Sequence, residues 1–327
     1  MKKINLAVVG ATGNVGRMIL KVLEEKDFPI ENLYLFSSKK SAGSEIDFKG
    51  KKYVVEELTE DVFDRDIDIA TFSAGGTISE KFAPIAASKG ITVVDNSSHF
   101  RMEKDIPLVV PEVNGKEALN NSGIIANPNC STIQSVLPLK PLYDKYGIKR
   151  VIYNTYQAVS GSGMKAIEDL ANKTCKVYPY PIAYNCLPHI DVFLENGYTK
   201  EEMKMIEETR KILDDDSLKV TATTVRVPIK NSHAVSINVE LEKDFDIEEI
   251  RKDFESFPGI IIRDDIENNI YPLEQESDGK DEVFVGRIRR DFSVDNGINF
   301  WCVADNLRKG AASNTVQIAE IVANEMQ

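Results

Sequence analysis

The hydrophobic residues in the N-terminal part of the chain form short continuous runs. Residues 4–10 read INLAVVG, an apolar run rich in Val and Ile that ends at a glycine. A run without alternation is typical of a strand buried on both faces, and parallel sheets are the usual hosts of such strands. Further runs of this kind occupy residues 33–37, 68–73, 91–95 and 124–126. Amphipathic segments such as residues 15–23 separate them, so the pattern predicts βαβ units.

The pattern changes near residue 150. Longer stretches in which apolar and polar residues alternate occupy residues 151–161, 221–229, 232–241 and 283–292. This alternation predicts strands with one buried face, as in a largely antiparallel sheet. Helical spacing is found at residues 199–213 and 311–326, and we expect the second of these helices to pack back on the first domain. Residues 263–282, rich in Asp, Glu and Asn, predict a solvated loop; the alternative is a loop that contacts a neighbouring subunit.

Composition and charge narrow the class of protein. The 327 residues include 42% hydrophobic and 28% charged side chains, an ordinary globular composition that argues against disordered, collagen-like and disulfide-built chains. The formal net charge of -12 opposes a nucleic-acid partner, because a phosphate backbone attracts clustered Lys and Arg. The first apolar run is too short for a signal peptide, and no run is long enough for a membrane span. We therefore expect a cytoplasmic protein without a membrane partner.

A glycine pattern follows the first predicted strand. Residues 10–16 read GATGNVG, which places G-x-x-G-x-x-G at a strand-to-helix turn. Glycines there allow a tight turn and the close approach of a pyrophosphate, whose charge is met by N–H groups at the helix N-terminus. The placement predicts a dinucleotide site; the alternative is a tight turn without a ligand. A second strand end with glycines, SAGG at residues 73–76, is expected along the same crevice.

The residues after the second predicted strand bear on the kind of dinucleotide. An NAD site usually carries Asp or Glu there to bind the ribose 2′-hydroxyl. This chain instead reads SSKKS at residues 37–41, and these hydroxyl and ammonium groups suit a 2′-phosphate. NADP is therefore favoured over NAD, unless the lysines form only a solvated loop.

Cys130 is the cysteine with a candidate chemical role. It lies in NPNCST, residues 127–132, where a predicted strand leads into a helix start. The helix dipole stabilises a thiolate at that position, and the same N–H groups can hold an oxyanion. A buried structural thiol is the alternative, and that interpretation is kept for Cys175, Cys186 and Cys302. The wide spacing of the four cysteines predicts neither disulfides nor a metal site.

A thiolate beside a nicotinamide indicates a specific chemistry. The thiol adds to an aldehyde and loses hydride to leave an acyl-thioester, or in reverse an activated acyl group is reduced. Such a site needs a base, and the chain has only His99, His189 and His233. His233 is the candidate, because it follows VRVP at residues 225–228 in a strand-like region.

Eight motifs occur in an order that resembles one family. They are GATGNVG, SAGG, DNSSHFR, VVPEVN, NPNCST, YQAVSGSG, VRVP with SHAV, and FVGRIRRD. The chain closely resembles the aspartate-β-semialdehyde dehydrogenases, of the bacterial and archaeal branch that uses NADPH, from residue 4 to the C-terminal helix. The resemblance implies reductive dephosphorylation of L-aspartyl 4-phosphate to L-aspartate 4-semialdehyde through a cysteine acyl-thioester. This step would stand on the route to lysine, threonine and methionine.

The resemblance also implies a role for each matching side chain. Cys130 would be the nucleophile, His233 the acid/base catalyst, and Gln157 would orient the bound intermediate.

The implied substrate contacts lie on both predicted domains. Arg226 would clamp the α-carboxylate with its guanidinium fork, and Arg101, assisted by Asn96, would bind the phosphate. Glu208 and Lys211 match the family's E-x-x-K pair, with Glu208 meeting the substrate amino group and Lys211 the phosphate. Glu and Lys at this spacing are also commonplace on exposed helices.

The implied cofactor contacts are Thr12, Gly13, Asn14 and Val15 at the pyrophosphate, Lys40 and Ser41 at the 2′-phosphate, Ser160 and Gly161 at the nicotinamide, and Asn306 closing the pocket. Two positions depart from the family pattern. Lys40 stands where many relatives carry Arg, which predicts weaker discrimination against NAD. His99 stands where a small residue is expected before Phe-Arg, and we expect it to be a spectator; the alternative is that it senses the phosphate.

Together these observations predict an α/β fold with two domains. A Rossmann-type parallel-sheet NADP-binding domain would occupy residues 1–129, completed by a C-terminal helix at 310–327. An α+β catalytic and dimerisation domain of mostly antiparallel sheet would occupy residues 130–309. The family resemblance implies small-molecule substrates and a homodimer or homotetramer.

Two alternatives stay open. One is a reductase of another acyl phosphate, such as a glutamyl or N-acylated derivative; Glu208 argues against an acylated nitrogen, which carries no charge. The other is a non-catalytic relative that binds NADP, in which Cys130, Gln157 and His233 would have no reason to coexist.

Overall fold

The computed structural model describes residues 3–326, and the chain divides into two compact units. The first contains the chain up to Pro128 together with the residues from Ala311 onward. The second is Asn129–Gly310.

The first unit is built on a six-stranded sheet in the order β5-β2-β1-β6-β7-β8, in which every neighbouring pair is parallel. Its strands are β1 (Ile4–Val9), β2 (Ile30–Ser37), β5 (Glu56–Glu57), β6 (Ile69–Phe72), β7 (Thr92–Asp95) and β8 (Ile124–Ala126). Every residue of β1 is buried, as the unbroken apolar run predicts. The parallel Rossmann-like sheet is therefore confirmed.

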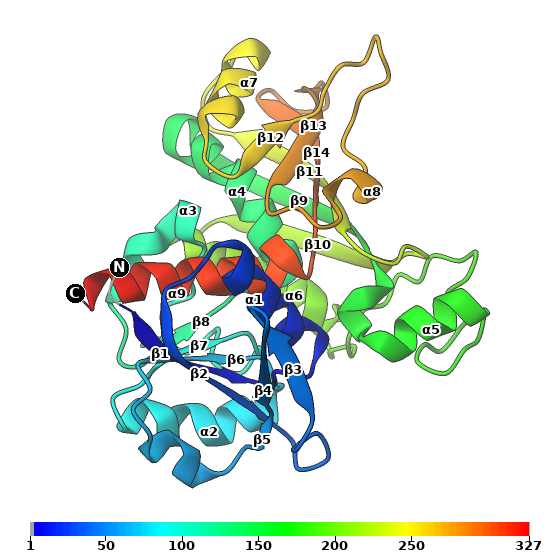
Figure 1. The fold of residues 1–327 in the computed structure, drawn as a ribbon. Coiled ribbons are helices and arrows are strands. Elements are labelled where there is room, and N and C mark those ends of the chain that lie inside the picture. The colour runs from blue at the N-terminus through cyan, green and yellow to red at the C-terminus, as the bar shows by residue number, and fades with distance from the viewer. Residues whose placement is uncertain (1–2, 327) are drawn as a thin grey trace. The chain divides into compact units, whose positions relative to one another are not determined.

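Helices cover both faces of this sheet. They are α1 (Asn14–Glu25), α2 (Gly76–Ser88), α3 (Pro111–Asn114) and α9 (Ser313–Glu325), and a small hairpin is formed by β3 (Glu45–Phe48) and β4 (Lys51–Val54). Figure 1 shows α1 and α9 on one face and α2 on the other. Ile19 and Leu23 of α1 share one hydrophobic core with Val316 and Val322 of α9 and with Val8 of β1. The C-terminal helix thus completes the core of the first unit.

The second unit is built on another six-stranded sheet, in the order β10-β9-β11-β14-β13-β12. Its strands are β9 (Ile148–Gln157), β10 (Lys219–Arg226), β11 (His233–Leu241), β12 (Ile260–Ile262), β13 (Val283–Asp291) and β14 (Gly297–Ala304). The central pairs are antiparallel, as predicted, whereas the edge strands β10 and β12 pair in parallel with their neighbours. The sheet is mixed and mostly antiparallel.

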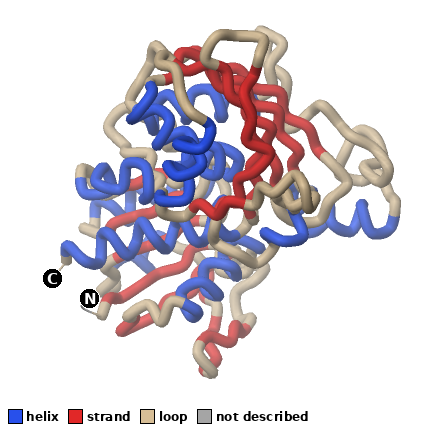
Figure 2. The backbone as a smooth tube through the Cα atoms, turned by 90° about the horizontal axis from the view of Figure 1, so that it is seen from above, coloured by secondary structure: helices blue, strands red, loops and turns tan. Residues whose placement is uncertain are grey.

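The helices of the second unit pack mainly on one face of its sheet, as Figure 2 shows. They are α4 (Cys130–Tyr146), α6 (Lys200–Leu213) and α7 (Ile247–Ser256), with α5 (Met164–Asn172) and the short α8 (Glu274–Ser277) further out. Thr199 begins α6 with a capping box, because its hydroxyl accepts from the Glu202 N–H and the Glu202 carboxylate accepts from the Thr199 N–H. Among residues 3–326, no helix is long and apolar enough to cross a membrane.

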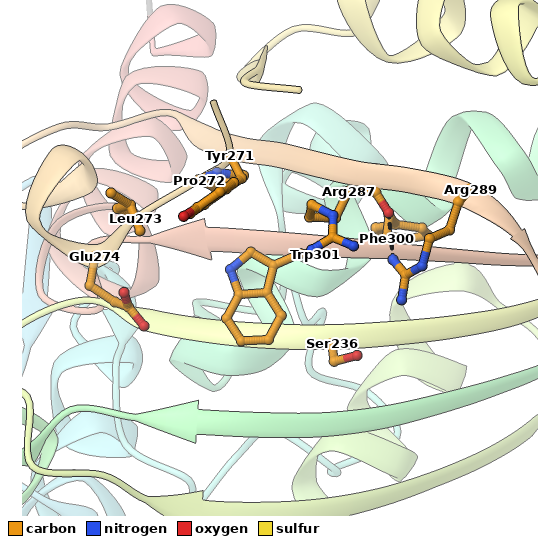
Figure 3. Close-up of a pocket in the computed structure, with 9 residues that line it drawn as sticks. All are labelled: Ser236, Tyr271, Pro272, Leu273, Glu274, Arg287, Arg289, Phe300 and Trp301. Carbon is orange, nitrogen blue, oxygen red and sulfur yellow. Dashed lines mark hydrogen bonds between the residues drawn. The ribbon is translucent and has the colours of Figure 1, made fainter. Parts of the chain in front are cut away.

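The opposite face of this sheet carries a groove of about 300 Å³. Figure 3 shows its lining: Ser236, Tyr271, Pro272, Leu273, Glu274, Arg287, Arg289, Phe300 and Trp301. The Trp301 ring lies 5.2 Å from the Tyr156 ring. Half of the segment 263–282 is exposed; the segment also contains α8 and supplies four lining residues.

Candidate active site

The turn between β1 and α1 brings backbone segments very close together. Gly10 has a φ of +86°, and a Cβ there would lie 2.8 Å from the Ser73 carbonyl carbon. A Cβ at Gly16 would lie 2.2 Å from the Gly10 carbonyl oxygen. Only glycine permits these approaches. Among the described residues, α1 has neither a side-chain cap nor an acidic residue in its first turn, so the end of the helix is suited to an anion.

The predicted cofactor residues of the first unit lie at this edge of the sheet. Thr12 and Gly13 form the turn, while Asn14 and Val15 begin α1. The Thr12 Oγ1 atom is 2.8 Å from the Ser37 Oγ atom, which ties the turn to the end of β2.

Lys40 and Ser41 follow β2 in a turn, and Lys40 is exposed. Because β1 and β2 are parallel neighbours, their carboxyl ends share one edge of the sheet. A glycine cradle, an uncapped helix start and a nearby ammonium group together fit a dinucleotide.

Arg101 and Asn96 are also brought together in the first unit. The Arg101 Nε donates to the Asn127 carbonyl oxygen at 2.9 Å, and its Nη2 donates to the Asn96 carbonyl oxygen at 2.9 Å. The Asn96 side chain is held at both ends, since Oδ1 accepts from the Thr315 hydroxyl and Nδ2 donates to the Phe72 carbonyl. His99 lies nearby in sequence but is exposed, with its ring against Phe100.

Strand register in the second unit aligns three predicted residues. Gln157 ends β9 and is the register partner of Arg226 in β10 and of His233 in β11. All three are buried, with exposed fractions of 1% for Gln157, 5% for Arg226 and 0% for His233. We call Arg226, Gln157 and His233 the polar row.

His233 is held as a neutral side chain. Its Nδ1 accepts from the Ala158 N–H at 3.0 Å, which assigns the proton of the neutral ring to Nε2. The Nε2 atom is buried and has no hydrogen-bond partner among the described residues. Burial, together with the Arg226 charge, lowers the pKa of His233 to about 3.

Arg226 lies beside His233. Its Nη1 donates to the Ala158 carbonyl at 2.6 Å, and its guanidinium lies 6.0 Å from the centre of the Tyr178 ring. A Cβ at Gly161 would lie 3.5 Å from Arg226 Nη1 and 3.7 Å from His233 Nε2. Gly161 therefore borders the space that these two polar side chains face.

Cys130 is the first residue of α4 and is half-buried. The side chain of Asn129 caps this helix by accepting from the N–H groups of Ser131 at 2.9 Å and Thr132 at 3.3 Å. One turn further along, Gln134 Nε2 donates to the His233 carbonyl at 3.0 Å. This bond ties the helix that carries Cys130 to the strand that carries His233.

The backbone near Gly310 packs directly against Cys130. A Cβ at Gly310 would lie 2.7 Å from the Cys130 Cβ atom. Gly310 belongs to the π-helical turn Arg308–Ala312, which follows Asn306. Asn306 Nδ2 donates to the Ser160 hydroxyl at 3.0 Å, and Asn306 Oδ1 accepts from the Ser232 N–H at 2.9 Å. The predicted nicotinamide neighbours Ser160 and Asn306 thus contact each other.

Neither member of the predicted pair on α6 is an exposed surface residue. Glu208 is 1% exposed, and its Oε2 accepts from the Asn129 N–H at 2.6 Å. Lys211 is half-buried one turn further along the helix. Contacts of this pair with substrate stay a prediction.

Sequence reasoning missed Glu201 and Lys204 on the same helix. The Glu201 Oε1 accepts from Asn129 Nδ2 at 2.8 Å and from Gln157 Nε2 at 3.0 Å, and its Oε2 accepts from Lys204 Nζ at 3.1 Å. Burial alone would raise the pKa of Glu201, but the Lys204 charge and these hydrogen bonds outweigh it and lower the pKa to about 2. The sequence signal that could have identified them is a second E-x-x-K spacing, Glu201 to Lys204, at the start of α6.

The other cysteines lie in different environments. Cys302 is buried, as predicted, which raises the pKa of its thiol to about 12, whereas Cys175 and Cys186 are exposed, so the prediction of buried structural thiols is wrong for these two. None of the four cysteines forms a disulfide. Within residues 3–326, no three His, Cys, Asp or Glu side chains gather as a candidate metal site.

Comparison with known proteins gives consistent results. Residues 5–122 match the family model "Semialdehyde dehydrogenase, NAD binding domain", and residues 139–309 match "Semialdehyde dehydrogenase, dimerisation domain". The aspartate-semialdehyde dehydrogenase of Aquifex aeolicus is 54% identical over 98% of both chains.

Solved structures agree. Aspartate semialdehyde dehydrogenase II of Vibrio cholerae, complexed with ASA, is 45% identical with a TM-score of 0.95 over 100% of both chains. The Candida albicans enzyme with NADP is 26% identical with a TM-score of 0.78, over 98% of this chain and 99% of that one. The chain belongs to the aspartate-semialdehyde dehydrogenase family.

Proposed function

We propose that Cys130 and the polar row carry out the family's reaction, the reductive dephosphorylation of L-aspartyl 4-phosphate. The observation that carries this proposal is the register of β9, β10 and β11, which aligns Gln157 with Arg226 and His233. A guanidinium, an amide and an imidazole at one strand edge suit a small substrate with a carboxylate and a reacting carbonyl. In the cell the step would lead toward lysine, threonine and methionine.

In the first chemical step the Cys130 sulfur attacks the acyl carbon. A C–S bond forms, the bond from carbon to the phosphate oxygen breaks, and phosphate leaves. The start of α4 favours the thiolate form of Cys130. Bound NADPH would supply the hydride that reduces the resulting thioester. The C–S bond of the resulting oxyanion would then break, which releases L-aspartate 4-semialdehyde and restores the Cys130 thiolate.

The hydrogen bonding of His233 indicates how it acts on the reacting carbonyl. With Nδ1 occupied by the Ala158 N–H, the neutral ring offers an Nε2–H donor. Such a donor stabilises negative charge on the carbonyl oxygen during attack. Taking a proton on Nδ1 instead would break the bond to Ala158. We therefore assign His233 the role of hydrogen-bond donor at Nε2, which stabilises the oxyanion without giving up its proton.

The remaining polar residues position the substrate. Arg226 faces the site with a buried Nε that has no partner among the described residues, which suits the α-carboxylate. Glu201 fixes the amide of Gln157 and brings Lys204 to the row, so this pair supplies the charges expected at first from Glu208 and Lys211. Arg101 with Asn96 is proposed for the phosphate.

The test is turnover in the reverse direction. Wild type should reduce NADP in the presence of L-aspartate 4-semialdehyde and phosphate, and Cys130→Ala should lose at least about 10⁴-fold in kcat. Cys175→Ser, which changes an exposed thiol, is the matched control and should retain activity.

Phosphate-independent turnover, or turnover that survives Cys130→Ala, would contradict the proposal. Activity with N-acetyl-glutamate semialdehyde but not with aspartate semialdehyde would favour a reductase of acylated substrates.

We further propose NADP as the cofactor. The supporting observation is Lys40 in the turn that follows β2, at the edge of the sheet where α1 begins. Lys40→Ala should lower kcat/KM for NADP about tenfold and leave that for NAD nearly unchanged, because only NADP carries the 2′-phosphate. Lys39→Ala is the control for charge alone, and equal losses with both cofactors would contradict the assignment.

A homodimer is proposed through the open face of the second sheet. This face presents Tyr156, Trp301 and a groove between β14 and the 263–282 segment, which is more apolar surface than a solvated sheet needs. Trp301→Glu should shift the mass measured by light scattering from dimer to monomer. Val54→Glu, an exposed position in the first unit, should not. A tetramer that survives Trp301→Glu would place the interface elsewhere.

A cytoplasmic location stays a prediction.

A further inference from the structure

Two glutamates of α6 converge on the residue before Cys130. Glu201 and Glu208 are seven positions apart, so they lie on the same face of the helix. Glu201 accepts from the Asn129 side chain at 2.8 Å, and Glu208 accepts from the Asn129 backbone N–H at 2.6 Å. Both glutamates are buried, with exposed fractions of 6% and 1%.

Asn129 is consequently held through three of its groups. Its N–H donates to Glu208, its Nδ2 donates to Glu201, and its Oδ1 accepts from Ser131 and Thr132. Hydrogen bonds to a carboxylate are the stronger kind, and a buried N–H that loses its acceptor carries a large penalty. The main chain leading into Cys130 is therefore fixed from α6.

We propose that Glu208 is a positioning residue that holds Cys130 through the Asn129 N–H, and that it does not contact the substrate. The inference rests on the proposed role of Cys130 as the nucleophile. Its physical basis is that one carboxylate oxygen of Glu208 is already bonded to the backbone and that the residue is almost fully buried. A small displacement of a nucleophile is enough to lower its reactivity by orders of magnitude.

The test uses the thiol reactivity of the complete chain without substrate. Iodoacetamide is neutral and small, and it forms a C–S bond with loss of iodide. The rate at Cys130 is followed by mass spectrometry of its peptide, and exposed Cys175 serves as the internal standard. Glu208→Ala should slow alkylation of Cys130 about tenfold and lower kcat by a similar factor, with KM for the semialdehyde within about twofold of wild type.

Two further variants sharpen the result. Glu208→Gln keeps an acceptor for the Asn129 N–H and should recover most of the alkylation rate. Glu207→Ala removes the same charge from the neighbouring, half-buried position and should leave Cys130 as reactive as in wild type.

The outcome that would overturn the proposal is an unchanged alkylation rate in Glu208→Ala combined with a raised KM, which would indicate a contact with the substrate amino group. If Glu208→Ala does not fold, Glu208→Gln still distinguishes positioning of Cys130 from contact with the substrate. A wild-type KM with near-normal alkylation supports positioning, and a large rise in KM contradicts it. Because alkylation needs no turnover, loss of the proposed function itself would not be mistaken for failure of this inference.

Discussion

The two candidate sites are made from different parts of the polypeptide. In the first unit the turn between β1 and α1 is shaped by backbone, since Gly10 and Gly16 bring main-chain atoms closer than any side chain allows. In the second unit the polar row is made of buried side chains held by hydrogen bonds, with Glu201 joining Asn129 and Gln157. A backbone site tolerates little added volume, whereas a side-chain site depends on charge and on the completeness of its bonds.

Breaking the backbone site should have the largest effect. Gly16→Ala introduces a Cβ that would lie 2.2 Å from the Gly10 carbonyl oxygen. We expect the free energy of unfolding to fall by about 3 kcal/mol, measured by urea denaturation, as for strongly overpacked positions. Gly13→Ala is the comparison in the same turn, because its Cβ would meet nothing closer than 3.4 Å. That variant should fold normally and lose affinity for dinucleotide, and equal stability of both variants would contradict the steric argument.

The side-chain site should lose stability when its buried groups become protonated. The unfolded chain protonates His233 below about pH 6.5, whereas the folded protein keeps it neutral down to about pH 3, so stability decreases as the pH falls through 6.5. The loss should reach roughly 2 to 3 kcal/mol between pH 6.5 and 4.5. Glu201, whose ordinary pKa is 4.5, adds a further loss of stability at the lower end of this window, because the unfolded chain takes up its proton there while the folded protein does not.

The measurement is the unfolding free energy as a function of pH for wild type and His233→Asn. The variant should lack this part of the slope. Parallel curves for the two proteins would show that His233 is not held neutral.

A third prediction tests whether backbone packing also matters in the second unit. Gly310→Ala places a Cβ 2.7 Å from that of Cys130, so the nucleophile must shift. We expect kcat to fall about tenfold with little change in KM, because displacement affects the reacting sulfur more than substrate binding. Steady-state kinetics measure both constants. A change confined to KM, with kcat unaltered, would contradict the predicted displacement of Cys130.

The smallest effect should come from a side-chain bond in the first unit. Ser37→Ala removes the 2.8 Å contact with the Thr12 hydroxyl, which is partly accessible to solvent. The expected loss of stability is under about 1 kcal/mol, with unchanged dinucleotide affinity in a fluorescence titration. A marked loss of affinity would mean that the turn is held by side chains after all.

Sequence reasoning located the backbone site more completely than the side-chain site. The strand, the glycines and the helix start are consecutive in residues 4–16, so local patterns predict the turn. Glu201 was missed because a glutamate on an amphipathic helix looks the same whether it meets water or a buried amide. Its importance arises from contacts with Asn129 and Gln157, which are far away in sequence.

The second sheet also shows what a local sequence pattern cannot predict. Alternation predicts which strand faces are buried, and the four predicted strands are confirmed as β9, β10, β11 and β13, whereas β12 and β14 were not predicted. It does not encode the direction of a neighbour, so the parallel pairing of β10 with β9 could not be predicted. That pairing is what sets Arg226 beside Gln157.

The position of α9 has a consequence for protein synthesis. Val316 and Val322 belong to the hydrophobic core of the first unit, and Asn314 donates from its side chain to the Val109 carbonyl at 2.9 Å and to Asn127 Oδ1 at 2.8 Å. All of Asn129–Gly310 must be translated before these contacts can form. The unit that starts first on the ribosome is thus finished last, and until then it exposes the apolar surface that chaperones recognise.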